Sequence, residues 1–429
     1  MLRNNLELIV QYPEPTGYRC RGFIGLHLAS PAYVVFDGAH QSDQGIANKL
    51  GIAFCDELLR YVGTKEHNVP CSGHVAGAGC HALKEITCRK ILVRPAANSA
   101  PSGGWPLPTA EPTWLQNWPK ANWDVVPIMP AGTTPSTYLP LEWQGINASF
   151  WTRDPTESLW AVIQRAGLSP EESRIFISYV RKDTTAVADQ LFSALTMEGF
   201  DVFLDRSSVP GGVQFQERLM QDLVDKAMVV FLNSAGVNQS KWVAEEIATI
   251  KTYRLGLLEL CFPGVPKRLD IDSDFTRELA DKDLESAGPD YAPQAMKLLA
   301  EPLKSIVERI KETHGRALHR RRYELIDNFA AALKQAGRKA QVLPDGTFLL
   351  PSSGSLNETV VGLTTRLPEL GDFCSLHQRG SISKGRLGWL ISPSPFFIAQ
   401  RQAYVSWLGG LCDIQHANEA QITTLAQNL

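Results

Sequence analysis

The feature that most constrains the fold is a regular alternation of short apolar runs and amphipathic segments between residues 174 and 262. Strands are predicted at 174–178, 201–204, 228–232 and 255–262, and helices at 184–198, at 215–227 and in the 240s. The run Met228-Val-Val-Phe-Leu232 is almost continuously apolar, as in a strand buried on both faces. Strands that alternate with helices of about 10–15 residues predict a doubly wound parallel sheet.

Polar residues follow the ends of these strands. In a doubly wound sheet the ligand crevice lies beyond the carboxyl ends of the strands. The loop at 178–183, the loop after Leu204 and the amino end of the 240s helix are therefore expected to converge there. On that helix Trp242 and Glu246 are four residues apart and share a face. A carboxylate beside an indole is partly desolvated, which makes Glu246 a candidate for acting on a positive charge.

Four motifs in this region occur in a characteristic order. They are Phe176-Ile-Ser-Tyr179, Gly199-Phe-Asp-Val-Phe-Leu-Asp205, Pro210-Gly-Gly-Val-Gln-Phe215 and Ser240-Lys-Trp-Val-Ala-Glu-Glu246. Together they resemble a Toll/interleukin-receptor (TIR) domain, covering about residues 171–313. The resemblance implies a central flavodoxin-like α/β domain with a doubly wound parallel sheet. Two smaller mixed α/β or α+β domains, 1–170 and 314–429, are expected to flank it.

The resemblance also implies an activity, because enzymatic TIR domains cleave the nicotinamide–ribose bond of NAD+. The carried-over catalytic residue is Glu246, four residues after Trp242, and not Glu245. The residues implied for substrate binding are Ser178, Tyr179, Arg181, Asp205, Gly211, Gly212 and Trp242. The sequence departs from the family pattern at Val180, where a basic residue is usual, so part of the contact to an anionic ligand is in question.

The chemistry agrees with these residues independently of the family. Nicotinamide in NAD+ is already a cationic leaving group, so a strong general acid is not required. An anion beside the ribose stabilises the developing oxocarbenium charge, and Arg181 can hold a phosphate. Water attack gives ADP-ribose, whereas attack by the adenine gives a cyclic product. NAD+ is thus expected as substrate, with neither a cofactor nor a metal.

Other interpretations of the same residues stay open. Trp242 can serve packing alone, Glu246 and Arg181 can be ordinary surface charges, and Ser178 can simply cap the backbone. A non-catalytic TIR adaptor that acts through domain contacts is the runner-up to the enzyme. A cyclase that makes a cyclic ADP-ribose signal is a third alternative.

The flanking regions carry no recognised family motif. In residues 1–170, strands are predicted at 6–10, 23–26, 33–36, 91–93 and 125–129, with helices at 45–62 and 157–166. Seven of the ten tryptophans lie between residues 95 and 160, which predicts an extended, indole-anchored wrapping segment. Cys71, His74, Cys80 and His81 are close enough for a zinc site, but their spacing is equally consistent with a loop.

The C-terminal region is predicted to hold two helices, a hairpin, a strand and a further helix. The helices lie at 292–312 and 318–337, the hairpin at 341–350 around Pro344-Asp-Gly346, the strand at 388–391 and the last helix at 396–408. The basic cluster His319-Arg-Arg-Arg322 is more typical of a solvated helix face than of a nucleic-acid contact.

Composition narrows the function classes further. The net charge of −3 does not favour nucleic acid or an anionic membrane, and no apolar run approaches the ~18 residues of a membrane span. The sequence lacks a signal peptide, so a cytoplasmic protein with eight thiols and no disulfides is expected. By resemblance, we expect an anti-phage defence effector of bacterial type that self-associates through its TIR domains. The flanks are expected to bind an unknown trigger, which is a protein, a nucleotide signal or a nucleic acid.

Overall fold

The chain forms two compact units, residues 1–170 and 171–429. The computed structural model describes residues 6–28, 31–38, 41–69, 89–96, 123–139, 145–168, 174–204, 221–239, 241–285, 293–343, 346–351, 358–381, 387–393 and 399–429. Of residues 41, 123, 238, 239, 241–246, 293, 379–381 and 387 it describes the backbone alone.

The first unit is built on one seven-stranded mixed sheet of order β4-β2-β1-β3-β5-β6-β7. Its strands are β1 (Leu8–Glu14), β2 (Gly17–Ile24), β3 (Ala32–Phe36), β4 (Lys65–Asn68), β5 (Arg89–Pro95), β6 (Trp123–Pro130) and β7 (Ser149–Trp151). β2 pairs antiparallel with β1 and β4, and all other neighbours are parallel. The predicted strands and helices of this region recur here, and β4, β7 and the β1–β2 hairpin are additions.

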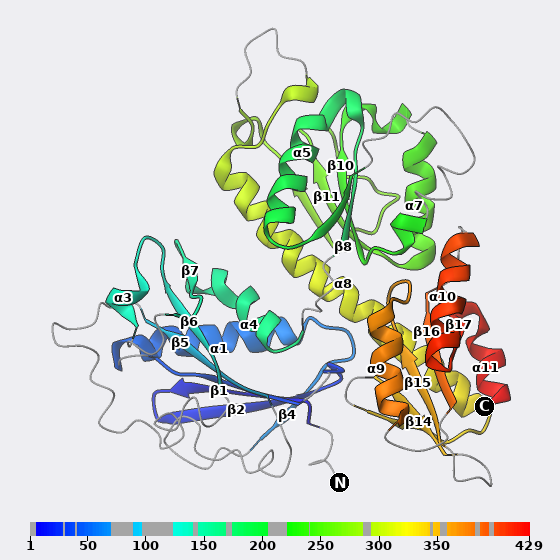
Figure 1. The fold of residues 1–429 in the computed structure, drawn as a ribbon. Coiled ribbons are helices and arrows are strands. Elements are labelled where there is room, and N and C mark those ends of the chain that lie inside the picture. Colours follow the sequence, from blue (N-terminus) through cyan, green and yellow to red (C-terminus); the bar gives the residue numbers. More distant parts are fainter. Residues whose placement is uncertain are drawn as a thin grey trace. The chain divides into compact units, whose positions relative to one another are not determined.

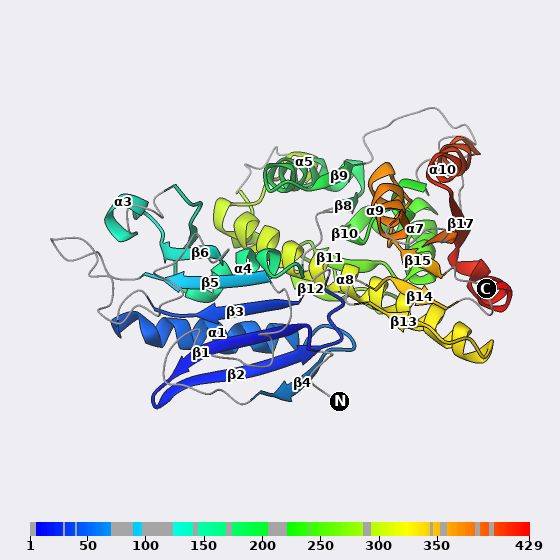
Figure 2. The same cartoon turned by 60° about the horizontal axis from the view of Figure 1, so that its bottom comes forward.

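Helices cover this sheet on both faces. Helices α1 (Gln44–Leu58) and α4 (Leu159–Arg165) contribute to one core, and Figure 2 shows α1 lying along β1 and β3. The short helix α3 (Pro135–Tyr138) lies beside the core of the opposite face. Trp151 and Trp160 are buried in the first core, so this end of the predicted wrapping segment belongs to the unit's own interior.

The second unit begins with a five-stranded parallel sheet of order β12-β11-β10-β8-β9. Its strands are β8 (Arg174–Ser178), β9 (Asp201–Leu204), β10 (Met228–Asn233), β11 (Gly256–Cys261) and β12 (Phe275–Glu278). The predicted strands are confirmed, and β12 was missed because its Phe-Thr-Arg-Glu sequence is polar. Figure 1 shows α5 (Arg181–Met197) and α7 (Lys241–Tyr253) on either side of β8, β10 and β11.

The second unit ends in another five-stranded sheet, in the order β13-β14-β15-β16-β17. Its strands are β13 (Gln341–Val342), β14 (Phe348–Leu350), β15 (Thr359–Leu363), β16 (Leu387–Ser392) and β17 (Ile414–Asn418). The predicted hairpin is confirmed as the antiparallel pair β13–β14, whereas β15, β16 and β17 are parallel. Helices α9 (Leu370–Ser381) and α10 (Ala399–Cys412) pack on one face, and α11 (Ile422–Asn428) with part of α8 on the other.

A single helix, α8 (Ala300–Gln335), connects the two sheets of this unit (Figure 1). Two helices were predicted here, and the boundary proposed at residue 313 lies inside this continuous helix. Ile306 and Ile310 are in the core of the parallel sheet, while Phe329 and Leu333 are in the core of the C-terminal sheet. Gly315 lowers helix propensity by about 1 kcal/mol, but burial of the middle of the helix outweighs this cost.

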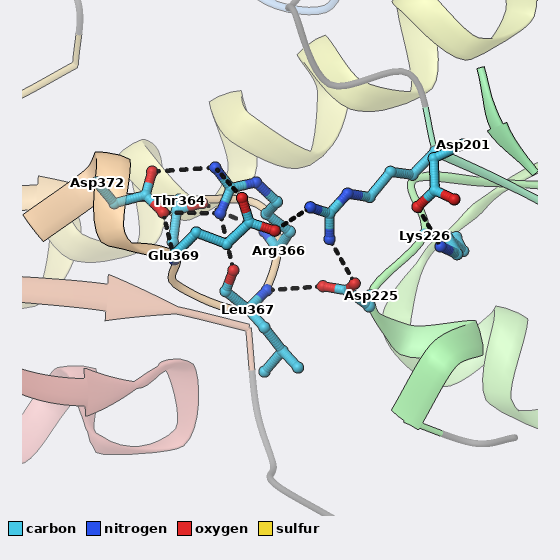
Figure 3. Close-up of polar contacts among 9 residues, drawn as sticks. Asp201, Asp225, Lys226, Thr364, Arg366, Leu367, Glu369 and Asp372 are labelled. Atoms are coloured by element: carbon cyan, nitrogen blue, oxygen red, sulfur yellow. Dashed lines mark hydrogen bonds and ion pairs between the residues drawn. The ribbon is translucent and has the colours of Figure 1, made fainter. Parts of the chain in front are cut away.

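A polar network joins the same two parts. Arg174 donates to Asp225 (2.6 Å) and to Glu369, and the buried backbone N–H of Leu367 donates to Asp225 at 2.9 Å. Figure 3 shows Asp225 facing Leu367, with Glu369 beside Arg366. Arg174 is the first residue of β8 and Asp225 precedes β10, so the C-terminal sheet region docks at the amino edge of the parallel sheet.

Further sequence expectations concern the cysteines, a metal site and a membrane span. Cys20 is disulfide-bonded, which corrects the expectation of eight thiols, whereas Cys55, Cys261, Cys374 and Cys412 are free. The cysteine and histidine set between residues 71 and 81 lies outside the described residues. Where side chains are described, no group of three or more His, Cys, Asp or Glu is arranged to hold a metal ion. No described helix has the length and apolar character needed to cross a bilayer.

Candidate active site

The candidate site lies at the carboxyl edge of the parallel sheet. Counted along the domain, the order of its strands is 2-1-3-4-5, with β8 as the first and β10 as the third. Chain connections leave β8 and β10 in opposite directions, and open α/β sheets bind their ligands at the carboxyl ends of two such strands. The residues that follow these two strands are therefore the ones placed to contact a ligand.

The turn after β8 lies at this edge of the sheet. Ser178 ends the strand and is buried, and Tyr179 and Arg181 are half-buried. Helix α5 begins at Arg181, so the predicted loop of six residues is shorter than expected. Thr184, where the helix was predicted to begin, has non-helical angles (φ −137°, ψ 22°) and marks a kink after the first turn. The backbone N–H groups of Asp183 and Thr184 both donate to the carbonyl of Val180, which holds this turn together.

Asp183 connects the turn after β8 to the turn after β10. Its Oδ2 accepts hydrogen bonds from Ser234 Oγ at 2.6 Å and from the backbone N–H of Gly236 at 2.7 Å. A Cβ at Gly236 would lie 2.6 Å from Asp183 Oδ2, so the glycine permits this close approach. The sequence analysis did not assign this role to Asp183. The sequence pattern that could have indicated it is an acidic residue in the first turn of a helix that follows a buried strand.

A buried polar pair lies under the face covered by α7. Phe176 and Phe231 face the core on this side, so strand alternation puts Ser178, Asn233 and Glu259 on the same face. Asn233 Nδ2 donates to Glu259 Oε1 at 2.9 Å, and the backbone N–H of Arg268 donates to the same oxygen at 3.1 Å. Glu259 is completely inaccessible to solvent. These bonds satisfy its carboxylate and position the end of β10.

The thiol at this edge is not a nucleophile. Cys261 ends β11 and is buried, and Asn233 Nδ2 lies 3.8 Å from its Sγ. Burial, and next the charge of Glu259, raise the pKa of Cys261 to about 11. The thiol is therefore protonated at neutral pH, whereas a reactive cysteine requires the thiolate.

The other predicted site residues lie on segments of which the structure describes only the backbone or nothing. Positions 242 and 246 belong to α7, and position 246 precedes the buried Ile250 by one helical turn. The side chains of Trp242 and Glu246 are outside the described residues, as are Asp205, Gly211 and Gly212 entirely. The structure thus brings Ser178, Tyr179 and Arg181 to the edge where α7 begins, and the role of Glu246 stays a prediction.

Comparison with known proteins identifies this domain. Two solved structures of proximal thread matrix protein 1 from the mussel byssus are 12% identical and cover 66% of this chain and 95% of theirs. Their TM-scores of 0.19 and 0.17 are too low to inform the fold. No curated protein matches the chain. A family model described as TIR domain matches residues 175–292, the segment that contains the parallel sheet. Residues 175–292 are therefore a TIR domain, and this domain is part of the second unit.

Proposed function

We propose that the protein is an NAD+ glycohydrolase that cleaves the bond between nicotinamide and ribose. The observation that carries the proposal is the TIR domain itself, with polar residues gathered at the carboxyl ends of β8 and β10. A crevice at this switch point is where open α/β sheets bind nucleotides. The products are nicotinamide and either ADP-ribose or its cyclic form.

In the proposed reaction Glu246 is the catalytic carboxylate. As the glycosidic bond breaks, positive charge develops on the ribose, and a carboxylate beside the sugar stabilises that charge. Nicotinamide leaves as a neutral molecule, and water adds to the ribose with loss of a proton. Arg181, at the start of α5, is proposed to hold the pyrophosphate, since a guanidinium binds phosphate oxygens in a bidentate manner.

The described contacts support a preorganised crevice. The Asp183 bonds to Ser234 and Gly236 hold the turns after β8 and β10 together. The Asn233–Glu259 pair holds the end of β10 from below. Preorganisation of this kind lowers the cost of ordering loops around a substrate.

The test is incubation of the purified full chain with NAD+, followed by chromatography of nicotinamide, ADP-ribose and cyclic ADP-ribose. Glu246→Ala is expected to lower turnover by at least about 100-fold, a loss typical for removal of one group that stabilises the transition state. The matched control is Glu245→Ala, one residue earlier on the same helix, which is expected to retain most activity. Equal loss in both variants would show that the assigned register is wrong.

A non-catalytic adaptor is the alternative from another class. TIR domains commonly self-associate, so an adaptor is expected to assemble with other TIR domains and to leave NAD+ unchanged. A cyclase is expected to consume NAD+ and to accumulate the cyclic product. A defence role, a trigger sensed by the flanking regions and activation by self-association are parts of the proposal. They are tested by adding candidate triggers and measuring NAD+ loss together with oligomeric state.

A further inference from the structure

Two free cysteines meet on the outer helices of the C-terminal sheet. Cys374 lies in the middle of α9, and Cys412 is the last residue of α10. The two helices pack against each other over one face of the sheet, where Phe373 and Leu376 share a core with Val405 and Leu408. Cys412 is packed against this same core. The positions of both cysteines are thus set by a well-packed helix pair.

Two observations place Cys374 close to Cys412. Burial, and next the neighbouring Cys374 side chain, raise the pKa of Cys412. His377, one turn after Cys374 on α9, contacts the backbone carbonyl of Cys412 through Nδ1 at 2.8 Å. Because a carbonyl oxygen accepts only, Nδ1 carries the proton and donates. Residues three apart on a helix share a face, so this second contact independently places the Cys374 face of α9 against the end of α10.

The pair also differs in accessibility from the other free thiols among the described residues. Cys374 is exposed and Cys412 is half-buried, whereas Cys55 and Cys261 are buried. Burial is the main cause that raises the pKa of Cys55 to about 12 and that of Cys261 to about 11. An oxidant in solution therefore reaches Cys374 first, and the neighbouring thiol is Cys412.

We propose that Cys374 and Cys412 are a redox-active dithiol that closes to an intrachain disulfide between α9 and α10. The oxidant is a low-molecular-weight disulfide such as oxidised glutathione. The Cys374 thiolate attacks one of its sulfurs, forms a mixed disulfide and expels one thiolate. Cys412 then loses its proton to solvent, attacks the Cys374 sulfur and expels the second thiolate. Two protein thiols are oxidised, and one glutathione disulfide is reduced to two thiols.

The location of the pair gives the crosslink a structural consequence. Glu369, the residue before α9, bonds Arg174 of the TIR domain, and the N–H of Leu367 bonds Asp225. The helix that carries Cys374 therefore begins at the junction with the TIR domain. Closing the disulfide ties this helix to α10 and restrains the two helices as one body.

The test is peptide mapping of the full chain after equilibration with oxidised and reduced glutathione. Free thiols are alkylated, and trypsin is added without a reductant. Cleavage after Arg366, Arg379 and Arg401 gives peptides 367–379 and 402–429, each of which contains one cysteine. The expected result is a disulfide-linked pair of these peptides that disappears on reduction. A mixture of 14N- and 15N-labelled chains is expected to give no mixed-label pair, which shows that the bond is intrachain.

Matched variants separate the proposal from nonspecific oxidation. Cys374→Ser and Cys412→Ser are each expected to abolish the linked pair, whereas Cys55→Ser is expected to leave its yield unchanged. Circular dichroism of the serine variants checks that they are folded. Recovery of both peptides fully alkylated from folded wild-type protein under oxidising glutathione would overturn the proposal. A linked pair that carries mixed labels would overturn it as well.

Discussion

The junction between the TIR domain and the C-terminal sheet leads to a quantitative prediction at Asp225. This carboxylate is 7% exposed and accepts bonds from Arg174 Nη1 at 2.6 Å and from the buried N–H of Leu367 at 2.9 Å. Burial alone would lower the pKa of Arg174, but Asp225 and Glu369 outweigh it and raise that pKa, so the guanidinium is charged. The substitution Asp225→Ala removes one charge partner and the acceptor for Leu367 together.

The expected cost follows from the burial of these groups. Breaking a buried ion pair from one side costs about 3–5 kcal/mol. In the variant, Arg174, which is 18% exposed, still pairs with Glu369. The side chain of Glu369 is 52% exposed, so solvent screens the attraction between these two charges. We take the low end of that range, about 3 kcal/mol, and allow roughly 1 kcal/mol more for the unpaired N–H of Leu367. Docking of the C-terminal region is therefore weakened by about 3–4 kcal/mol.

Hydrogen–deuterium exchange of the full chain, read by mass spectrometry, measures this loss locally. A single unfolding midpoint is not suitable, because a chain with several folded units does not unfold in one step. Peptides that contain Leu367 and the start of β8 are expected to exchange at least about 100-fold faster, since about 1.4 kcal/mol corresponds to tenfold. Peptides of residues 1–170 serve as the internal reference and are expected to be unchanged.

A second ion pair is the matched control. Asp270 is 54% exposed and pairs with Arg268 at 2.8 Å, so Asp270→Ala is expected to cost no more than about 1 kcal/mol. The reasoning is refuted if Asp225→Ala accelerates exchange near Leu367 less than about threefold. It is also refuted if the two substitutions have the same effect there.

Three further predictions concern other contacts of the second unit. Burial lowers the pKa of His314 to about 4, below its ordinary value of 6.5. As the pH falls, the imidazole is therefore protonated in the unfolded chain before it is protonated in the folded chain. The stability of the fold thus decreases between about pH 6.5 and about pH 4. His314→Leu is expected to remove about 2.5 kcal/mol of that loss between pH 7 and pH 4.5. The measurement is hydrogen–deuterium exchange of peptides around His314, corrected for the intrinsic exchange rate at each pH. A Cβ at Gly256 would lie 2.3 Å from the Cβ of Ala317 on α8. Gly256→Ala is therefore expected to destabilise the folded state by about 1–3 kcal/mol. In a double-mutant cycle, Ala317→Gly in the same chain is expected to restore part of this stability. Asp183→Ala removes the bond between the two crevice turns and is expected to raise the KM for NAD+ about tenfold, with Asp183→Asn milder because its amide oxygen still accepts. An unchanged KM in both variants would separate this contact from substrate binding.

Much of the TIR domain was predictable from the sequence because its signals are local. An apolar run such as residues 228–232 is buried on both faces of a sheet wherever it lies, so its assignment to a strand needs no knowledge of its neighbours. The polar strand β12 lacks such a signal, and it becomes a strand through pairing with β11. The division of 292–337 into two helices failed for a similar reason, since burial of Gly315 and its neighbours overrides the weak local propensity.

Some features of the candidate site were likewise predictable from the sequence, and others were not. The sequence by itself predicted that the residues after β8 and β10 lie at one edge of the sheet, because the carboxyl ends of parallel strands share an edge. The tertiary structure decided that Asp183 bonds Ser234 and Gly236 and that Glu259 pairs with Asn233. It also placed His377 of α9 against the carbonyl of Cys412, and Asp225 against Arg174 and Leu367. Each of these contacts joins residues at least 26 positions apart, and no local pattern encodes a hydrogen bond between residues so distant in the chain.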